Sequence, residues 1–182
     1  MEAHKSRLKY SNIPKRYLDA RLSDFSVEIS KDIDKFITCT GWASLLVLGP
    51  VGTGKTHLAC AIAHEVAKTN TVLYTTLYGM SQKVMADMND YSKKEQYKHR
   101  GAEIFQKVGI LIIDEMGRSF ATDAEKNRLF DIINYRYENL LPTAILANKS
   151  KDELFHSIGE GVADRLRENM KGLVLTGKSW RK

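Results

Sequence analysis

The sequence predicts an α/β fold of three layers, a five-stranded parallel sheet between helices, and two stretches carry this prediction. Residues 49–56, GPVGTGKT, fit the phosphate-binding pattern G-x-x-x-x-G-K-[ST]. A short apolar run at 44–48 precedes this loop as a strand would, and a helical pattern at 57–68 follows it. The second stretch, 108–115, is a continuous apolar run typical of a buried parallel strand, and it ends in two acids.

The glycine-rich loop predicts a site for a nucleoside triphosphate. Its glycines let the backbone curl so that successive N–H groups point at a phosphate, and the helix N-terminus that follows also favours an anion. Lys55 is expected to reach the β- and γ-phosphate oxygens, and the Thr56 hydroxyl is expected to ligate Mg²⁺. The residues expected around the nucleotide are Gly49, Pro50, Val51, Gly52, Thr53, Gly54, Lys55, Thr56 and His57.

Two acids and an amide are expected beside this loop, because the catalytic groups of open parallel sheets lie at the carboxyl ends of the strands. Asp114 is the candidate acid that holds Mg²⁺, through water or directly. Glu115 is the candidate base that orients or deprotonates an attacking water. Asn148 follows another predicted strand, where it holds that water or senses the γ-phosphate, or else caps the next segment in an Asx turn. Spacing alone leaves both roles of Asn148 open.

Further apolar runs complete five predicted strands, at 44–48, 72–76, 108–115, 143–147 and 173–175. Helical patterns between them supply the crossovers of a parallel sheet, at 32–40, 57–68, 78–89, 124–139, 152–155 and 161–168.

The composition indicates one soluble, basic domain. The chain has 182 residues and no apolar run near the ~20 residues that a membrane span needs. A net charge of +6 favours a polyanionic partner. Cys39 and Cys60 lack metal-ligand spacing and are expected to be free thiols in a reducing cytoplasm.

Two regions are candidates for contact with nucleic acid. Residues 1–24 are expected to form a basic arm, with Pro14 interrupting any helix, ahead of a main domain at 25–182. The polar stretch 90–100 mixes cations with tyrosines, which suits the phosphates and bases of a single strand, although a solvated helix face has the same pattern. The candidate contacts are Lys83, Lys93, Lys94, Tyr97, Lys98 and Arg100.

Four segments in order, GPVGTGKT, ILIIDE, ILANKS and VADRLRE, resemble the AAA+ ATPases of the DnaC/DnaI helicase-loader and IstB group. The entry segment from Ile13 to Phe25 is also similar. The resemblance covers nearly the whole chain and implies that ATP and Mg²⁺ are the cofactors. It further implies that Asn148 is the sensor-1 residue and that Arg165 is an arginine finger acting in a neighbouring subunit. Arg181 is loosely similar to the sensor-2 arginine.

Two departures from the usual helicase loader accompany this resemblance. Only residues 1–24 precede the ATPase core, so the element that grips a helicase is expected to be missing, shortened or supplied in trans. The 34 residues after Asn148 leave room for a minimal C-terminal lid, which fits the loader and IstB group better than other AAA+ branches.

The leading hypothesis is an ATP-dependent loader that self-assembles on single-stranded DNA and acts on a replicative helicase. The second is an IstB-like ATPase that remodels duplex DNA for a transposase. The third is a nucleotide-gated module that binds and inhibits a helicase with little hydrolysis. A small-molecule kinase is disfavoured, because nothing resembles an acceptor-binding lid and Glu115 suits water as the nucleophile.

Overall fold

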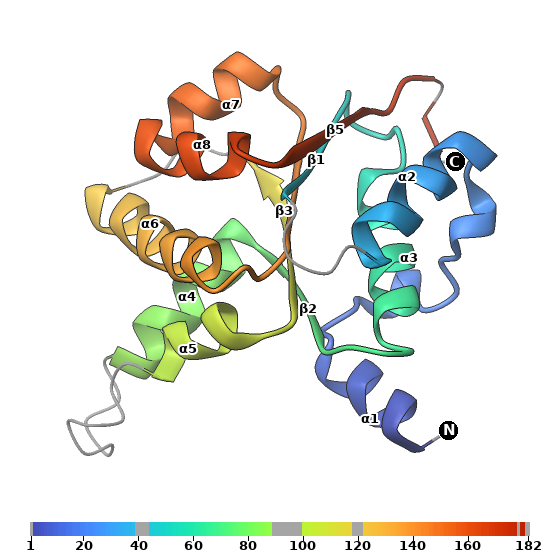
Figure 1. The fold of residues 1–182 in the computed structure, drawn as a ribbon, viewed down its shortest axis with the longest axis horizontal. Helices are drawn as coiled ribbons and strands as arrows, with labels where there is room; N and C mark the ends of the chain where they lie inside the picture. The colour runs from blue at the N-terminus through green and yellow to red at the C-terminus, as the bar shows by residue number, and fades with distance from the viewer. Residues whose placement is uncertain (1, 39–43, 89–99, 118–121, 178, 181–182) are drawn as a thin grey trace.

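The computed structural model describes residues 2–38, 44–88, 100–117, 122–177 and 179–180, and shows a sheet between two layers of helices (Figure 1). The five strands lie in the order β2-β3-β4-β1-β5, and all neighbouring pairs are parallel. The predicted fold class is therefore confirmed. The strands are β1 (Ser44–Leu48), β2 (Val72–Thr76), β3 (Ile110–Met116), β4 (Thr143–Ala147) and β5 (Met170–Val174).

Helices cover both faces of this sheet, with α2 and α3 on one side and α4 to α8 on the other (Figure 1). The α-helices are α1 (Glu2–Tyr10), α2 (Val27–Thr38), α3 (Lys55–Val66), α4 (Leu77–Met88), α5 (Arg100–Lys107), α6 (Asp123–Glu138), α7 (Lys151–Ile158) and α8 (Glu160–Arg167). Two short 3-10 helices, η1 (Lys15–Tyr17) and η2 (Leu22–Asp24), lie between α1 and α2.

The predicted strands at 44–48, 72–76 and 143–147 coincide with β1, β2 and β4. The fifth strand begins at Met170, three residues before the predicted start, because its first residues pair with β1 although most of them are exposed. The helix after the loop begins at Lys55, two residues earlier than predicted, because Gly54 adopts the left-handed conformation (φ 91°) that ends the loop. No described helix has the length and apolar character that crossing a membrane requires.

Residues 2–24 contact the main body of the chain. The segment expected to be an arm is helical at Glu2–Tyr10, with an acid in its first turn and bases in its last, an order that the helix dipole favours. Arg7 donates hydrogen bonds to the carbonyls of Ala67 and Lys68 (2.7 and 2.6 Å), at the end of α3. Ala20 is buried in the core beneath α3. The division of the chain at residue 24 stays a prediction.

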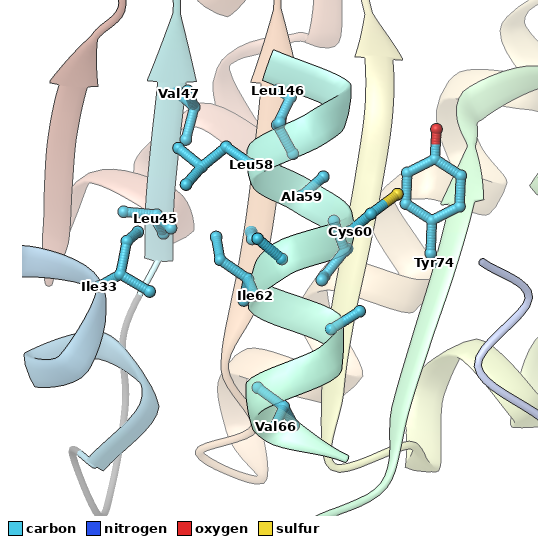
Figure 2. Close-up of a cluster of buried hydrophobic side chains, with 14 of the residues drawn as sticks. Ile33, Leu45, Val47, Leu58, Ala59, Cys60, Ile62, Val66, Tyr74 and Leu146 are labelled. Atoms are coloured by element: carbon cyan, nitrogen blue, oxygen red, sulfur yellow. The ribbon is translucent and has the colours of Figure 1, made fainter. Parts of the chain in front are cut away.

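Two apolar cores lie on the two faces of the sheet. Figure 2 shows the core on the α3 face, where Leu58 and Ile62 point toward β1 and β4. Cys60, also in this core, is a fully buried free thiol, and burial raises its pKa to about 12. Cys39 lies outside the described residues.

Arg136 of α6 is the largest fully buried side chain of the described residues and joins three elements. Its guanidinium donates to the hydroxyl of Thr143 (2.9 Å), at the start of β4, and to five main-chain carbonyls. These carbonyls belong to Phe105, Gln106, Val108, Gly109 and Pro142, at 2.5–3.2 Å. Burial lowers the pKa of Arg136 to about 9, which still leaves the group charged at neutral pH. Arg136 therefore fastens the end of α5 and the entry of β4 to α6.

Candidate active site

The predicted phosphate-binding loop connects β1 to α3 and has the required backbone. Gly52 and Gly54 have φ of 90° and 91°, a region in which side chains other than glycine are strained. Gly54 is the N-cap of α3, so the N-terminal, positive end of that helix dipole lies at the loop. Lys55 bridges the loop, because its Nζ donates to the carbonyls of Gly49 and Pro50, both at 2.7 Å.

A cavity of about 520 Å³ opens over this loop. It is lined by Arg16, Tyr17, Val51, Gly52, Gly54, Lys55, Thr56, His57, Asp114, Glu115, Ala147, Asn148 and Trp180. Most residues that the sequence assigned to the nucleotide site thus surround one space. Gly49, Pro50 and Thr53 are not in the lining, and Thr53 is buried with its hydroxyl on the carbonyl of Pro50 (2.9 Å). These three belong to the loop but do not border the cavity.

Thr56 and Asp114 meet at the back of the cavity. The Thr56 hydroxyl donates to Oδ2 of Asp114 at 2.7 Å, and Asp114 is only 2% exposed. Among the described residues, no three His, Cys, Asp or Glu side chains gather as a metal ion would need. Mg²⁺ that arrives with nucleotide phosphates needs only one or two protein ligands, and a hydroxyl beside a carboxylate fits that requirement.

A β-bulge turns the second acid into the same cavity. Ile113 pairs with Ile145 and Met116 pairs with Ala147, so β3 advances three residues where β4 advances two. Glu115, inside this irregularity, has a left-handed backbone (φ 53°). Regular alternation would send the side chains of Asp114 and Glu115 to opposite faces of the sheet. The extra residue instead places both in the lining of the cavity.

Strand order explains the position of Asn148. Because β4 lies between β3 and β1, its end lies between the Asp114–Glu115 pair and the phosphate loop. Asn148 follows β4 directly, is exposed and lines the cavity. The N-cap of the next helix is Ser150, whose hydroxyl accepts from the backbone N–H of Glu153 (3.3 Å) at the start of α7. The role of Asn148 stays a prediction.

Aromatic rings form one rim of the cavity. The ring of Trp180 stacks on Phe25 at 5.0 Å between centroids, and His57 lies within 6 Å of both. Nε2 of His57 is 2.6 Å from Oδ2 of Asp24, and this hydrogen bond lowers the pKa of Asp24. The rim brings together residues 24–25, the start of α3 and Trp180 near the C-terminus.

The last described residues lie across the phosphate loop. The backbone N–H of Trp180 donates to the carbonyl of Gly52 at 2.9 Å, and Ser179 is so close that a Cβ on Gly52 would lie 2.5 Å from its hydroxyl oxygen. The loop is therefore covered on the side of the C-terminal segment and open toward the cavity. Arg181, the sensor-2 candidate, lies outside the described residues.

Arg165 does not reach this cavity. It lines a second cavity of about 290 Å³ together with Ser44 and Thr143, the first residues of β1 and β4. Its Nε donates to Asn134 at 2.6 Å, and its guanidinium lies over the ring of Phe130 at 4.7 Å. At about 3.3 Å per residue, the two ends of β4 are roughly 13 Å apart. Arg165 thus lies at the amino-terminal ends of the strands, whereas its own phosphate loop lies at their carboxyl ends.

Of the candidate DNA contacts, Lys83 forms an ion pair with Asp87 (3.3 Å) on α4. Arg100 begins α5, and its side chain lies outside what the structure describes. Lys93, Lys94, Tyr97 and Lys98 lie outside the described residues as well.

Sequence reasoning missed the side chain that contacts Asp114 from the neighbouring strand. The hydroxyl of Tyr74 in β2 donates to Oδ2 of Asp114 at 3.0 Å. Sequence reasoning also missed that Arg16 and Tyr17, which belong to the segment that carries part of the family resemblance, line the nucleotide cavity. The available signal for Arg16 and Tyr17 was the presence of a basic and an aromatic residue side by side in that segment. No local signal existed for Tyr74, because only the pairing of β2 with β3 brings it to Asp114.

The fold and this site define a P-loop nucleotide-binding protein of the AAA+ class. Residues 26–182 match the family described as IstB-like ATP binding protein, and the chain belongs to that family. The replicative helicase loader DnaC of Escherichia coli K12 is 32% identical over 127 residues, which are 69% of this chain and 50% of DnaC. A putative ATP-binding protein of insertion sequence IS5376 from Geobacillus stearothermophilus is 33% identical over 145 residues, 76% of this chain and 55% of that protein.

The chain therefore spans about half the length of the curated relatives it matches. Among solved structures, a crystal structure of the DnaC helicase loader superposes with a TM-score of 0.76 at 24% identity, covering 90% of this chain and 100% of that one. This similarity supports the AAA+ fold. The predicted membership of the DnaC/DnaI and IstB group is confirmed.

Proposed function

We propose that the chain binds and hydrolyses ATP and that this cycle drives a DnaC-like helicase loader, which acts on single-stranded DNA and a replicative helicase. One observation carries the catalytic part of the proposal. Lys55, Thr56, Asp114, Glu115 and Asn148 come from three neighbouring strand ends and line one cavity. A cation, a metal-binding pair, a candidate base and an amide are the set that phosphoryl transfer to water needs.

The roles follow from the contacts. Lys55 rests on two loop carbonyls and would exchange them for phosphate oxygens, which are stronger acceptors because they are charged. Thr56 and Asp114 are the residues that would hold Mg²⁺, which would neutralise the charge of the phosphates when bound. Glu115 and Asn148 orient the attacking water from the exposed side of the cavity.

The position of Arg165 supports an ATP-dependent homo-oligomer. Because Arg165 lies at the amino-terminal ends of the strands, it is unable to stabilise the charge that develops on the phosphates in its own site. It can instead enter the site of a neighbouring copy. Its hydrogen bond to Asn134 is one that a phosphate oxygen can replace. ATP would then join the subunits, and hydrolysis would release them.

A second candidate function is remodelling of duplex DNA for a transposase. The family match over 26–182 and the 33% identity to the insertion-sequence protein favour it. The catalytic core is shared by both candidates, so the kind of DNA distinguishes them.

The test uses Glu115→Gln, which should retain ATP without hydrolysing it. Its affinity for fluorescent single-stranded and duplex oligonucleotides is measured across a salt series, with and without ATP, and Lys55→Ala is the control that lacks ATP binding. The loader predicts that ATP raises affinity for the single strand and steepens the salt slope by about 0.7 per added phosphate contact. A preference for duplex DNA would favour the transposition role. Intact ATP binding with wild-type turnover near zero would instead indicate a nucleotide-gated binding module.

A further inference from the structure

A buried hydroxyl group faces the candidate metal site from the neighbouring strand. Tyr74 is 6% exposed, and its hydroxyl donates to Oδ2 of Asp114 at 3.0 Å. The same oxygen accepts the hydroxyl of Thr56 at 2.7 Å, and Oδ1 accepts the backbone N–H of Glu115, also at 2.7 Å. Three donors from three elements therefore fix the plane of the Asp114 carboxylate.

The pairing of β2 with β3 explains why a tyrosine reaches this acid. Thr76 is the direct partner of Asp114, and Tyr74 is the partner of Ile112, two residues earlier. Alternation places Tyr74 and Asp114 on the same face, toward α3, as diagonal neighbours. Diagonal neighbours are about 7–8 Å apart, a distance that only aromatic and long side chains cover.

Tyr74 is held in place independently of Asp114. Its backbone N–H donates to the carbonyl of Ser11 (2.8 Å), and its carbonyl accepts from the side chain of Asn12 (3.1 Å). In Figure 2 its ring lies beside the sulfur of Cys60, and its hydroxyl points toward the carboxyl ends of the strands. Burial, together with the nearby Asp114 carboxylate, raises the pKa of Tyr74. The hydroxyl therefore stays protonated and donates a hydrogen bond to Asp114.

We propose that Tyr74 is a positioning residue of the Mg²⁺ site, which holds Oδ2 of Asp114 against Thr56 and so fixes the orientation of the carboxylate that would hold the metal. This inference rests on the proposed binding of Mg²⁺ with ATP. Each carboxylate oxygen accepts about two hydrogen bonds. Within the part of the chain that the structure describes, Oδ2 accepts two, from Thr56 and Tyr74, whereas Oδ1 accepts one, from Glu115. With Oδ2 satisfied in this way, Oδ1 keeps acceptor capacity for the metal or for a water bound to it.

The test variant is Tyr74→Phe, which removes the hydroxyl and keeps the ring that packs beside Cys60. Loss of a residue that orients a metal ligand typically weakens metal affinity 10–100-fold. We expect the Mg²⁺ concentration for half-maximal binding of a fluorescent ATP analogue to rise about tenfold. Binding of the analogue in EDTA should stay unchanged. Electron paramagnetic resonance of Mn²⁺ in the presence of ADP measures the same change without any turnover.

Two controls isolate the hydroxyl. Tyr78→Phe, an exposed tyrosine at the start of α4, should leave the Mg²⁺ dependence unchanged. In an Asp114→Asn background, Tyr74→Phe should add no further weakening, because Tyr74 acts through Asp114. An equal loss in both backgrounds would point to a purely structural role and overturn the inference.

The remaining outcomes separate this inference from the proposed function. Equal Mg²⁺ dependence of Tyr74→Phe and wild type would overturn the role of Tyr74 alone. A lower Mg²⁺ requirement in the variant would overturn it too, because the hydroxyl would then only reduce the charge on Asp114. A wild-type chain that binds no ATP in saturating Mg²⁺ would instead refute the proposed function.

Discussion

Replacing Arg136 by lysine should destabilise the fold by a large and calculable amount. The guanidinium brings five N–H donors to six acceptors, two of them in fully buried and four in partly buried hydrogen bonds, whereas an ammonium brings three donors. At least two of the hydrogen bonds are therefore lost. A hydrogen bond to a charged group contributes about 1.5–3 kcal/mol, so Arg136→Lys should lower the free energy of unfolding by about 3–6 kcal/mol. Whole domains have only about 5–15 kcal/mol.

Urea unfolding without nucleotide, followed by circular dichroism, measures this loss. Arg128→Lys is the matched control, since it makes the same exchange on α6 at a partly exposed site, and it should change the free energy by less than about 0.5 kcal/mol. A loss below about 1 kcal/mol for Arg136→Lys would refute the reasoning. It would mean that water or a small shift of α5 satisfies the carbonyls equally well.

Three further predictions concern the nucleotide site and pH. Lys55→Ala should abolish ATP binding, whereas Glu115→Gln should bind ATP normally and hydrolyse it poorly; equal loss of binding in equilibrium titrations would show that the role of Glu115 is misassigned. Arg165→Ala should keep the ATP affinity of the single subunit and lose about 10³–10⁵ in turnover. Mixing Arg165→Ala with Lys55→Ala protein should partly restore turnover, and wild-type turnover independent of protein concentration would contradict a shared site. Burial lowers the pKa of His64, so the unfolded chain binds the proton more readily, and stability should fall as pH drops below about 6.5. Thermal unfolding of His64→Gln, with a weaker pH dependence in that range, checks this.

The strands and the loop were predictable because their signals are local. Residues 72–76 and 143–147 are short β-branched or apolar runs, and β2 and β4 occupy these positions. The loop GPVGTGKT carries its own backbone requirement in its glycines. Such features need no knowledge of the distant chain.

Features that depend on register were not predictable. Tyr74 was read as an ordinary strand residue, since its contact with Asp114 exists only in one pairing of β2 with β3. The bulge at Glu115 was equally invisible, because it is defined by the partner strand β4. The helix at the N-terminus was missed for another reason. The prediction for residues 2–10 used only their basic composition and not the order of their charges, with an acid first and bases last, which favours a helix.

The left-handed backbone of Glu115 has a consequence for protein engineering. A residue other than glycine or asparagine in this conformation costs about 1–2 kcal/mol, and glycine carries no such cost. Variants with glycine at position 115 should therefore melt at a higher temperature than the wild type while lacking the carboxylate. With Glu115 as the proposed base, a library sorted only for thermal tolerance would enrich such chains and lose turnover, whereas a library sorted for turnover would keep the acid and its strain.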